Sequence, residues 1–243
     1  MWSLTGLAVF WRDCGGTEES CFTYSLRMSF DLLAPHYRWM EWFLAGGKLQ
    51  RCRTAHLPLI ENGLNILLMG EGNGRFLLHC RRRFPGAWIT CVDASARMLS
   101  AAQQRLLGHG LGSQHVRFVQ ADALAWSPPS EAFDIIATHF FLDCFRPEQL
   151  HQLIESLAQA ARPKAFWLVA DFHVPARGMA RLRAQAIHWL MYRFFRWVTL
   201  LPATQLTPPD GYLRAAGFEL RKREFSEWGL LRSDLWQSLA LKN

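Results

Sequence analysis

The sequence lacks any apolar run long enough to cross a membrane. A membrane-spanning helix needs about 18 or more apolar residues, whereas the best candidate, residues 187–201, is shorter and contains two arginines. Cysteine pairs at metal-binding spacing are absent as well. The six cysteines are scattered without a CxxC pair, so neither a zinc site nor a disulfide framework is expected. These absences favour reduced thiols in a cytoplasmic protein.

The first 27 residues lack the features of a secretory signal. They include a short apolar run, but no basic region before it and no small-residue cleavage site after it. Organised sequence begins near Met28, which is a candidate start site. We therefore expect residues 1–27 to form a poorly ordered extension and residues 28–243 to form one domain.

Acidic residues are outnumbered: 27 Lys and Arg face 20 Asp and Glu, which gives a formal net charge of +7. Half of the residues are hydrophobic and 13% are aromatic, so the chain can bury a sizeable core. The positive charge suits an acidic partner, an anionic membrane surface or RNA. It concerns association and carries no information on the fold.

Apolar, β-rich runs alternate with helical patterns through the middle of the chain. The five expected strands are 65–70, 87–93, 116–122, 133–140 and 165–172, and the helices between them are 74–83, 95–107 and 147–161. Strands that alternate with crossover helices, and that are apolar throughout, predict a parallel sheet buried on both faces. After them follow a long amphipathic cover or lid helix within 176–202, a short helix closed by Gly217, and a hairpin of 218–226 and 230–239. The expected fold is α/β and Rossmann-like, a doubly wound, mostly parallel, seven-stranded sheet with a C-terminal antiparallel hairpin.

Three alternating glycines, "GEGNG" at 70–74, directly follow the first expected strand. Such a turn usually holds phosphate, but Arg75 and Leu77 stand where a GxGxxG pattern needs its last glycine, and no GK[ST] follows. Glu71 would repel a pyrophosphate by about 1–4 kcal/mol at ~4 Å, depending on the local dielectric. The turn therefore favours a nucleoside-like ligand that is cationic where NAD carries phosphate. S-adenosylmethionine (SAM) fits, through its sulfonium and ammonium groups.

Two further carboxylates end the next two strands. Ligands of open α/β sheets bind beyond the carboxyl ends of the strands. Asp93 is placed to accept both ribose hydroxyls, and Asp122 is placed to accept from an adenine amino group. The alternatives are that Asp93 only caps the following helix and that Asp122 is a turn residue.

At these residues the sequence resembles the class I SAM-dependent methyltransferases. "ILLMGEGNGRF" is similar to their glycine-rich motif, "ITCVDASARML" to their ribose-binding strand, and "VRFVQADAL" to their adenine-binding strand. "FDIIATHFFLDCF" resembles the fourth-strand segment that lines the site, and "RAAGFEL" the approach to the terminal hairpin. The resemblance spans about 60–240. It extends to the small-molecule group that includes ubiquinone and menaquinone C-methyltransferases, whose "YDxW"-like segment is similar to "PHYRW" here.

The resemblance implies SAM as the cofactor and no metal. The implied cofactor-binding residues are Tyr37, Gly70, Glu71, Gly72, Asn73, Gly74, Asp93, Ala94, Met98, Asp122, Ala123, Thr138 and His139. Tyr37 would close over the methionine end of the cofactor. The chain departs from the family at Leu68, where an acidic residue is common, and we infer that Glu71 takes over the charge-balancing role.

Methyl transfer needs a base only where the nucleophile must lose a proton. The candidates are His139 and Asp143 after the fourth strand, and Asp171 and His173 after the fifth. His139 is favoured because the resemblance puts it beside the methyl group. His139 could instead be a core histidine, and Asp143 could be structural.

The acceptor is expected to be a small, apolar or aromatic molecule, methylated at oxygen, nitrogen or carbon. Enzymes that methylate base amines often carry [DNS]PP[YFW] after the fourth strand. This chain has "THFFLDC" there, and its "SPPS" at 127–130 follows the third strand. No nucleic acid partner is therefore expected. The alternatives are an RNA methyltransferase and a catalytically silent SAM-fold interaction protein.

The helix near 181–201 combines arginines with tryptophans and phenylalanines and has no acidic residue. Such a helix can lie on a membrane surface or roof an apolar substrate pocket. The alternative is a cover helix packed on the sheet. A peripheral membrane contact through 181–201 is therefore one expected partner interaction.

Overall fold

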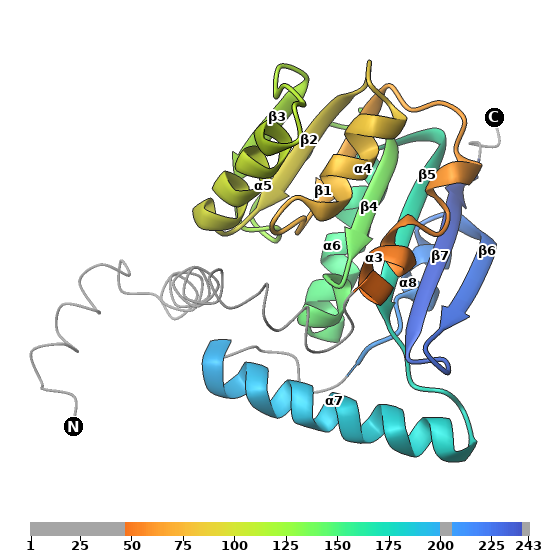
Figure 1. Ribbon diagram of the computed structural model, residues 1–243. Coiled ribbons are helices and arrows are strands. Elements are labelled where there is room, and N and C mark those ends of the chain that lie inside the picture. The colour runs from red at the N-terminus through yellow and green to blue at the C-terminus, as the bar shows by residue number, and fades with distance from the viewer. Residues whose placement is uncertain (1–46, 200–205, 240–243) are drawn as a thin grey trace, which may run out of the picture.

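The computed structural model describes residues 47–199 and 206–239 (Figure 1). The expected extension at 1–27, the candidate start Met28 and the cofactor candidate Tyr37 lie outside these ranges. The expectations about them stay predictions.

One seven-stranded sheet organises the chain. Its strands are β1 (Asn65–Met69), β2 (Trp88–Asp93), β3 (Val116–Gln120), β4 (Phe133–His139), β5 (Ala161–Phe172), β6 (Phe218–Ser226) and β7 (Leu231–Ser238). They lie in the order β3-β2-β1-β4-β5-β7-β6. Strands β1 to β5 pair in parallel, and β7 runs antiparallel to both β5 and β6. The predicted doubly wound sheet with a C-terminal antiparallel hairpin is confirmed.

The strand order reverses between β1 and β4, which are neighbours in the sheet although two strands separate them in the chain. Met69 at the end of β1 pairs with Thr138 near the end of β4. The glycine turn that follows Met69 and the His139 that follows Thr138 therefore emerge side by side. This reversal is the position at which open α/β sheets bind their ligands.

Helices cover both faces of the sheet (Figure 1). Helices α4 (Arg75–Arg83) and α5 (Ala96–Gly108) contribute to one hydrophobic core, and α6 (Pro147–Ala160) and α8 (Asp210–Ala215) to the other. Helix α3 (Gly47–Thr54) packs near the carboxyl end of β5 and the first residue of β7 through Leu49 and Cys52. Two short 3-10 helices, η1 (Leu57–Leu59) and η2 (Leu142–Cys144), complete the described elements.

Strand β5 begins four residues earlier than the sequence predicts, at Ala161 instead of residue 165. The reason is an irregular start: Phe133 pairs with Ala161, and the register then shifts before Ile135 pairs with Phe166. Lys164, in the left-handed region at φ 64°, lies within this irregularity.

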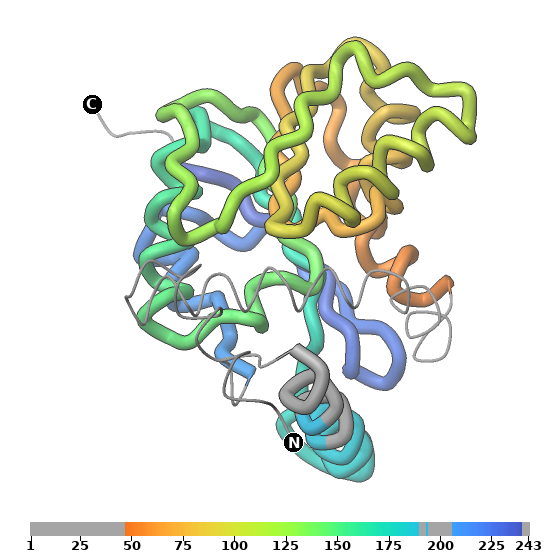
Figure 2. Tube along the Cα trace, turned by 90° about the vertical axis from the view of Figure 1, so that its left-hand side faces the viewer, coloured from red at the N-terminus to blue at the C-terminus, as the bar shows by residue number. Residues whose placement is uncertain are grey.

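Helix α7 (Gly178–Thr199) lies beyond the carboxyl edge of the sheet in both views (Figures 1 and 2). It meets the domain at its inner side, where Ala184 and His188 are buried. The Arg183 guanidinium donates to the carbonyl of Glu227 at 3.1 Å, and the His188 ring lies 5.7 Å from that of Phe172. Within residues 47–199 and 206–239, neither α7 nor any other helix has the length and apolarity to span a bilayer.

Candidate cofactor site

The turn between β1 and α4 is built from three left-handed glycines. Gly70, Gly72 and Gly74 have φ of 62°, 65° and 79°, a region that costs an L-residue about 1–2 kcal/mol. A side chain would also collide at two of them. A Cβ at Gly74 would lie 2.7 Å from the Cα of Ala102 in α5, and one at Gly70 would run into the ring of Phe141. The glycines therefore let the turn pass close to α5 and to the segment after β4.

Glu71, inside this turn, caps helix α4. Its Oε1 accepts from the N–H groups of Phe76 and Leu77 at 2.8 and 2.9 Å, and Gly74, at the N-cap position, has no side chain to do so. Burial raises the pKa of Glu71 to about 7, although the two N–H groups and Arg53 act in the opposite direction. Glu71 is therefore both a structural cap and a carboxyl group poised to ionise near neutral pH.

Asp93, at the end of β2, is bonded to the glycine turn. Its Oδ2 accepts from the Gly72 N–H and its Oδ1 from the Ser95 N–H, each at 2.9 Å. Ser95, and not Asp93, is the N-cap of α5, because the Ser95 hydroxyl oxygen accepts from the Met98 N–H at 3.2 Å. The alternative of Asp93 as the helix cap is therefore wrong. Each carboxylate oxygen has a second lone pair with which it could accept from a hydroxyl.

Asp122, which follows β3, has the geometry of a turn residue. Its Oδ1 accepts from the Leu124 N–H at 3.0 Å, and its carbonyl accepts from Ala125 and Trp126. One carboxylate oxygen is thereby committed to the turn. Ala121 donates its N–H to the carbonyl of Asp93, which places the residues after it beside the end of β2. Asp122 and Ala123 are both half-buried there. The turn alternative and the adenine role are compatible for this residue.

The side chain of Thr138 points away from the expected site. Thr138 is fully buried, and its hydroxyl oxygen accepts from the Trp167 indole N–H at 2.9 Å. A contact between this hydroxyl and a cofactor is therefore excluded by its core packing. The sequence could not show this, because the side-chain direction depends on which face of β4 each residue takes.

A pocket opens where β1 and β4 end. It is lined by Arg53, Met69, Gly70, Glu71, Ala137 and His139. His139 is buried and makes an edge contact with the Phe76 ring, with the centroids 4.3 Å apart. Burial, followed by the charge of Arg53, lowers the pKa of His139 well below its ordinary value. His139 is therefore neutral at physiological pH and able to accept a proton.

Arg53, on α3, is the pocket residue that the sequence did not identify. It is 7% exposed, and its guanidinium lies 5.1 Å from the centroid of the Phe140 ring. Phe140 follows β4 at φ 52°, a strained conformation for a bulky residue that turns its ring towards Arg53 and Phe172. Arg53 lies in no motif, and it is far from β4 in the sequence. The sequence alone therefore could not predict its contact with Phe140. The pocket thus combines a cation with the carboxyl group of Glu71.

Asp143 and Asp171, two of the base candidates, lie close enough for the charge of Asp143 to act on Asp171. Burial raises the pKa of Asp143 to about 6 and, with the nearby charge of Asp143, raises that of Asp171 well above its ordinary value. The Cys144 thiol donates to Asp143 at 3.6 Å, and the Phe172 N–H donates to Asp171 at 2.8 Å. Neither lines the pocket that contains His139.

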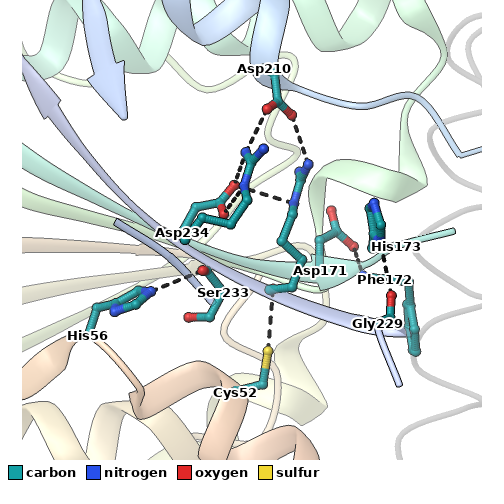
Figure 3. A network of polar contacts seen from close by, with 11 residues as sticks. Cys52, His56, Asp171, Phe172, His173, Asp210, Gly229, Ser233 and Asp234 are labelled. Carbon is teal, nitrogen blue, oxygen red and sulfur yellow. Dashed lines mark hydrogen bonds and ion pairs between the residues drawn. The ribbon is translucent and has the colours of Figure 1, made fainter. Parts of the chain in front are cut away.

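His173 lies at the β6–β7 turn. Its Nδ1 is 2.8 Å from the carbonyl oxygen of Gly229 (Figure 3). Its ring centroid is 4.7 Å from that of Phe225. A carbonyl only accepts, so Nδ1 carries the proton and donates. Of the four base candidates His139, Asp143, Asp171 and His173, the structure brings only His139 to the pocket.

A network of charged groups anchors the hairpin to α8 (Figure 3). Arg223 and Arg232 both bind Asp210 and Asp234, at N–O distances from 2.6 to 3.3 Å. Asp234 is fully buried, and Arg232 is 5% exposed. This network fixes the hairpin next to β5, and its residues do not line the pocket.

The residues present fit a SAM molecule. The turn brings backbone close to a ligand without Cβ atoms, and Asp93 supplies a carboxylate at the end of β2. Glu71 and Arg53 supply the two charges that complement a zwitterionic amino acid group. In addition, the Asn73 side chain is buried, and its Nδ2 has no hydrogen-bond partner among the described residues. The turn therefore holds one donor that a ligand oxygen could use. Ala94 is half-buried beside Asp93, and Met98 is buried in the first turn of α5.

The chain is similar to known methyltransferases over the segment that forms this site. The family described as a methyltransferase domain matches residues 66–164, which include the glycine turn, Asp93, Asp122 and His139. A demethylmenaquinone methyltransferase of Thermus thermophilus is 30% identical over 151 residues, which cover 61% of this chain and 66% of that protein. A trans-aconitate 2-methyltransferase of Paracidovorax citrulli is 46% identical over 94 residues, covering 36% of this chain and 33% of that protein. The chain thus spans less than two thirds of the length of these relatives.

Solved structures share the fold. The N-methyltransferase NodS from Bradyrhizobium japonicum, in complex with S-adenosyl-L-homocysteine, superposes with a TM-score of 0.55 at 15% identity, over 79% of this chain and 84% of that one. Together with the strand order and the glycine turn, these matches show a methyltransferase domain over residues 66–164 and the fold of the class I SAM-dependent methyltransferases.

Proposed function

We propose that this protein transfers a methyl group from SAM to a small, apolar or aromatic acceptor. The observation that supports this most directly is the pocket at the ends of β1 and β4, where Arg53 and Glu71 flank Gly70. A pocket for a pyrophosphate would not carry a carboxyl group at this point, because like charges repel.

Two groups of residues would bind SAM, one at its nucleoside and the other at its methionine moiety. Asp93 would accept from the ribose hydroxyls, and the half-buried Asp122 would meet the adenine. Ionised Glu71 would stabilise the cationic groups, and Arg53 would bind the carboxylate of the methionine moiety. The cofactor supplies a methyl group on a sulfonium, an excellent leaving group, so positioning supplies much of the rate enhancement.

The apolar or aromatic character of the acceptor is supported by the side chains around the pocket. Phe140 and Phe172 pack together with their ring centroids 5.1 Å apart, and Phe141 packs on Phe145 at 5.0 Å. Phe140, Phe141 and Phe145 follow β4 and Phe172 ends β5, so these rings lie at the carboxyl edge of the parallel strands. The similarity to relatives named for quinone methylation supports the same class. Neutral His139 would take the proton of an acceptor that must lose one.

The experiment for the cofactor is isothermal titration with SAM, S-adenosyl-L-homocysteine and NAD. We expect SAM and S-adenosyl-L-homocysteine to bind with micromolar affinity, and NAD to bind at least about tenfold more weakly, because Glu71 would face its pyrophosphate. NAD binding more tightly than SAM would refute the proposal. A protein that binds none of them would point to the silent SAM-fold alternative.

The experiment for the acceptor is methyl transfer from radiolabelled SAM. The acceptors to compare are demethylated quinols, simple phenols, trans-aconitate and total RNA. Label in a quinol or a phenol is the expected outcome, with no transfer in a His139→Phe variant if that acceptor must lose a proton. Label in trans-aconitate or RNA alone would refute the apolar acceptor while leaving SAM binding intact.

A further inference from the structure

Helix α7 exposes an apolar stripe on the side that faces away from the domain. Met179, Leu182 and Trp189 are 77%, 61% and 64% exposed. Their spacing of three and seven residues puts them on one side of the helix. The buried residues Ala184 and His188 lie on the opposite side, four residues apart. Exposed large apolar side chains gathered in this way mark an interaction surface.

A second element extends this stripe. The tip of the β6–β7 turn presents Trp228, which is 78% exposed, and Arg183 of α7 lies over its ring at 5.7 Å. Glu227, beside it, is bonded to both Lys48 and Arg183, so the tip is fixed against α7 and α3. We name Met179, Leu182, Trp189 and Trp228 together the α7 surface. Two exposed tryptophans, Trp189 and Trp228, therefore lie on elements that contact each other.

The charge around the α7 surface has one sign. The segment 174–199 contains five arginines and no Asp or Glu. Arg177, Arg181 and Arg183 are exposed, and Arg193 is exposed with its guanidinium 5.4 Å from the centroid of the Trp189 ring. Arginine beside tryptophan and aliphatic side chains is the composition of helices that lie in the headgroup region of a membrane.

We propose that the α7 surface docks onto an anionic lipid bilayer. The helix would lie parallel to the membrane, with its apolar stripe at the boundary of the acyl chains and its arginines among the anionic headgroups. Its 22 residues are about 33 Å long at 1.5 Å per residue, so the length lies in the plane of the membrane. The same edge of the sheet that carries the pocket then faces the lipid, because α7 lies along that edge (Figures 1 and 2).

Two other occupants fit less well. A second copy of the chain would bring an arginine-rich helix against an identical one, and like charges at close range repel. RNA would satisfy the arginines and could stack on the tryptophans, but it offers nothing apolar to Met179 and Leu182. Membrane docking also does not depend on the acceptor, because an enzyme for a water-soluble acceptor would bind vesicles equally well through this surface.

The test is co-sedimentation with vesicles. The full chain is mixed with vesicles that contain phosphatidylglycerol, or with vesicles of phosphatidylcholine alone. We expect binding to the anionic vesicles, at least about tenfold weaker binding to the neutral ones, and loss of binding as salt rises.

The chain offers a matched control for the variants. Leu182→Ser with Trp189→Ser should weaken vesicle binding about tenfold or more. Leu107→Ser with Trp88→Ser replaces the same residue types, which are 59% and 58% exposed on α5 and β2, and should bind like wild type. Arg193→Glu should weaken binding about fivefold to tenfold, whereas Arg117→Glu, on the exposed edge strand β3, should change it far less. Melting curves confirm that each variant is folded.

Three results would overturn the proposal. The first is no binding to anionic vesicles, and the second is an equal loss in the α7 and control variants. The third is a different occupant: a dimer in solution that the Leu182→Ser, Trp189→Ser variant separates, or RNA that competes vesicles off the protein at equal charge concentration.

Discussion

The Gly72 N–H donates to the Asp93 carboxylate at 2.9 Å, and this bond ties the tip of the glycine turn to the end of β2. The other oxygen of Asp93 accepts from Ser95 at the same distance. Asp93 therefore holds the turn in place before any ligand arrives. A carboxylate oxygen can accept more than one hydrogen bond, so the same carboxylate can also accept from a ribose diol.

Variants of Asp93 test whether this residue contributes to SAM affinity, to folding stability, or to both. Asp93→Ala should weaken SAM binding by roughly 2–4 kcal/mol, or about 30- to 1000-fold, because the diol loses a charged acceptor and the turn loses its tie. Asp93→Asn should also bind SAM weakly. Its amide nitrogen is a donor, whereas the N–H groups of Gly72 and Ser95 and the ribose hydroxyls all need an acceptor at this position. The measurements are SAM titration and thermal melting.

Ser95→Ala is the matched control for this prediction. It removes the α5 cap and should cost about 1 kcal/mol of folding stability, while SAM affinity in the folded protein stays within about threefold of wild type. If Asp93→Ala retained wild-type affinity, the ribose would be bound elsewhere.

The three glycines of the turn should differ in their tolerance of a methyl group. Gly72→Ala meets nothing within 4 Å and adds only left-handed strain, which costs about 1–2 kcal/mol. Gly70→Ala carries the same strain and also collides with Phe141. We therefore expect Gly70→Ala to lower the melting temperature more than Gly72→Ala does. Equal melting temperatures would show that Phe141 moves aside without cost.

Arg53 should act on the amino acid end of the cofactor alone. Arg53→Ala removes the cation of the pocket, so SAM should bind about tenfold or more weakly, as expected when a hydrogen-bonded charge loses its partner. 5′-Methylthioadenosine, which has the nucleoside but no amino acid group, should bind the variant and wild type equally. Parallel titrations with the two ligands test this. An equal loss for both would mean that Arg53 only supports the fold.

The sequence predicted the elements of this fold closely because its strands are short, buried and separated by helical patterns. NILLM and WITCVD are mainly apolar, and the glycine turn, Asp93 and Asp122 are local signals at strand ends. The glycine turn, Asp93 and Asp122 lie at the same edge of the sheet because the strands that they follow or end run parallel to one another. The positions of these residues could therefore be inferred without coordinates.

What the sequence could not show depends on side-chain direction and long-range contact. Thr138 lies in the same strand as His139, yet the alternation of side chains along β4 turns its hydroxyl into the core against Trp167. Arg53 reaches the pocket from a helix outside every motif. The second function of Glu71, as the cap of α4, requires the turn to fold back over the helix start. None of these contacts is marked by a characteristic spacing of residues in the sequence.

Glu71 should make SAM binding depend on pH. Its pKa in the folded protein is raised from an ordinary value of 4.5 to about 7, so the folded state holds the proton more tightly than the unfolded state. The resulting contribution to stability is fully present below pH 4.5 and is lost as pH rises through 7. A cationic ligand favours the ionised form. If only that form binds, SAM affinity should rise about tenfold between pH 6 and pH 8.

Calorimetry in two buffers of different ionisation enthalpy would detect the proton that SAM binding releases at pH 7. Glu71→Gln keeps an oxygen that can cap α4 but cannot ionise, so its SAM affinity should be low and nearly independent of pH. A pH dependence that survives in Glu71→Gln would assign the titration to another group.

The buried charge network should dominate the stability of the C-terminal hairpin. Asp234→Ala would leave the guanidiniums of Arg223 and Arg232 without the carboxylate that they share at 2.7 and 3.3 Å. Breaking a buried pair in this way typically costs about 3–5 kcal/mol. On the same hairpin, Glu219→Ala removes an exposed ion pair with Arg221 and should cost at most about 1 kcal/mol. Denaturant unfolding of both variants gives the two values directly.

The network also predicts how stability changes in acid. Burial tends to raise the pKa of Asp210, but its bonds to Arg223 and Arg232 outweigh burial, and the pKa lies below the ordinary value of 3.8. A lowered pKa means that the stabilisation is present above pH 3.8 and is lost as pH falls through the folded-state value. Asp210→Asn should therefore be less stable than wild type at pH 7, and the difference should shrink as the pH is lowered below 3.8. A difference that stayed constant down to acid unfolding would show that the charge of Asp210 contributes nothing to the hairpin.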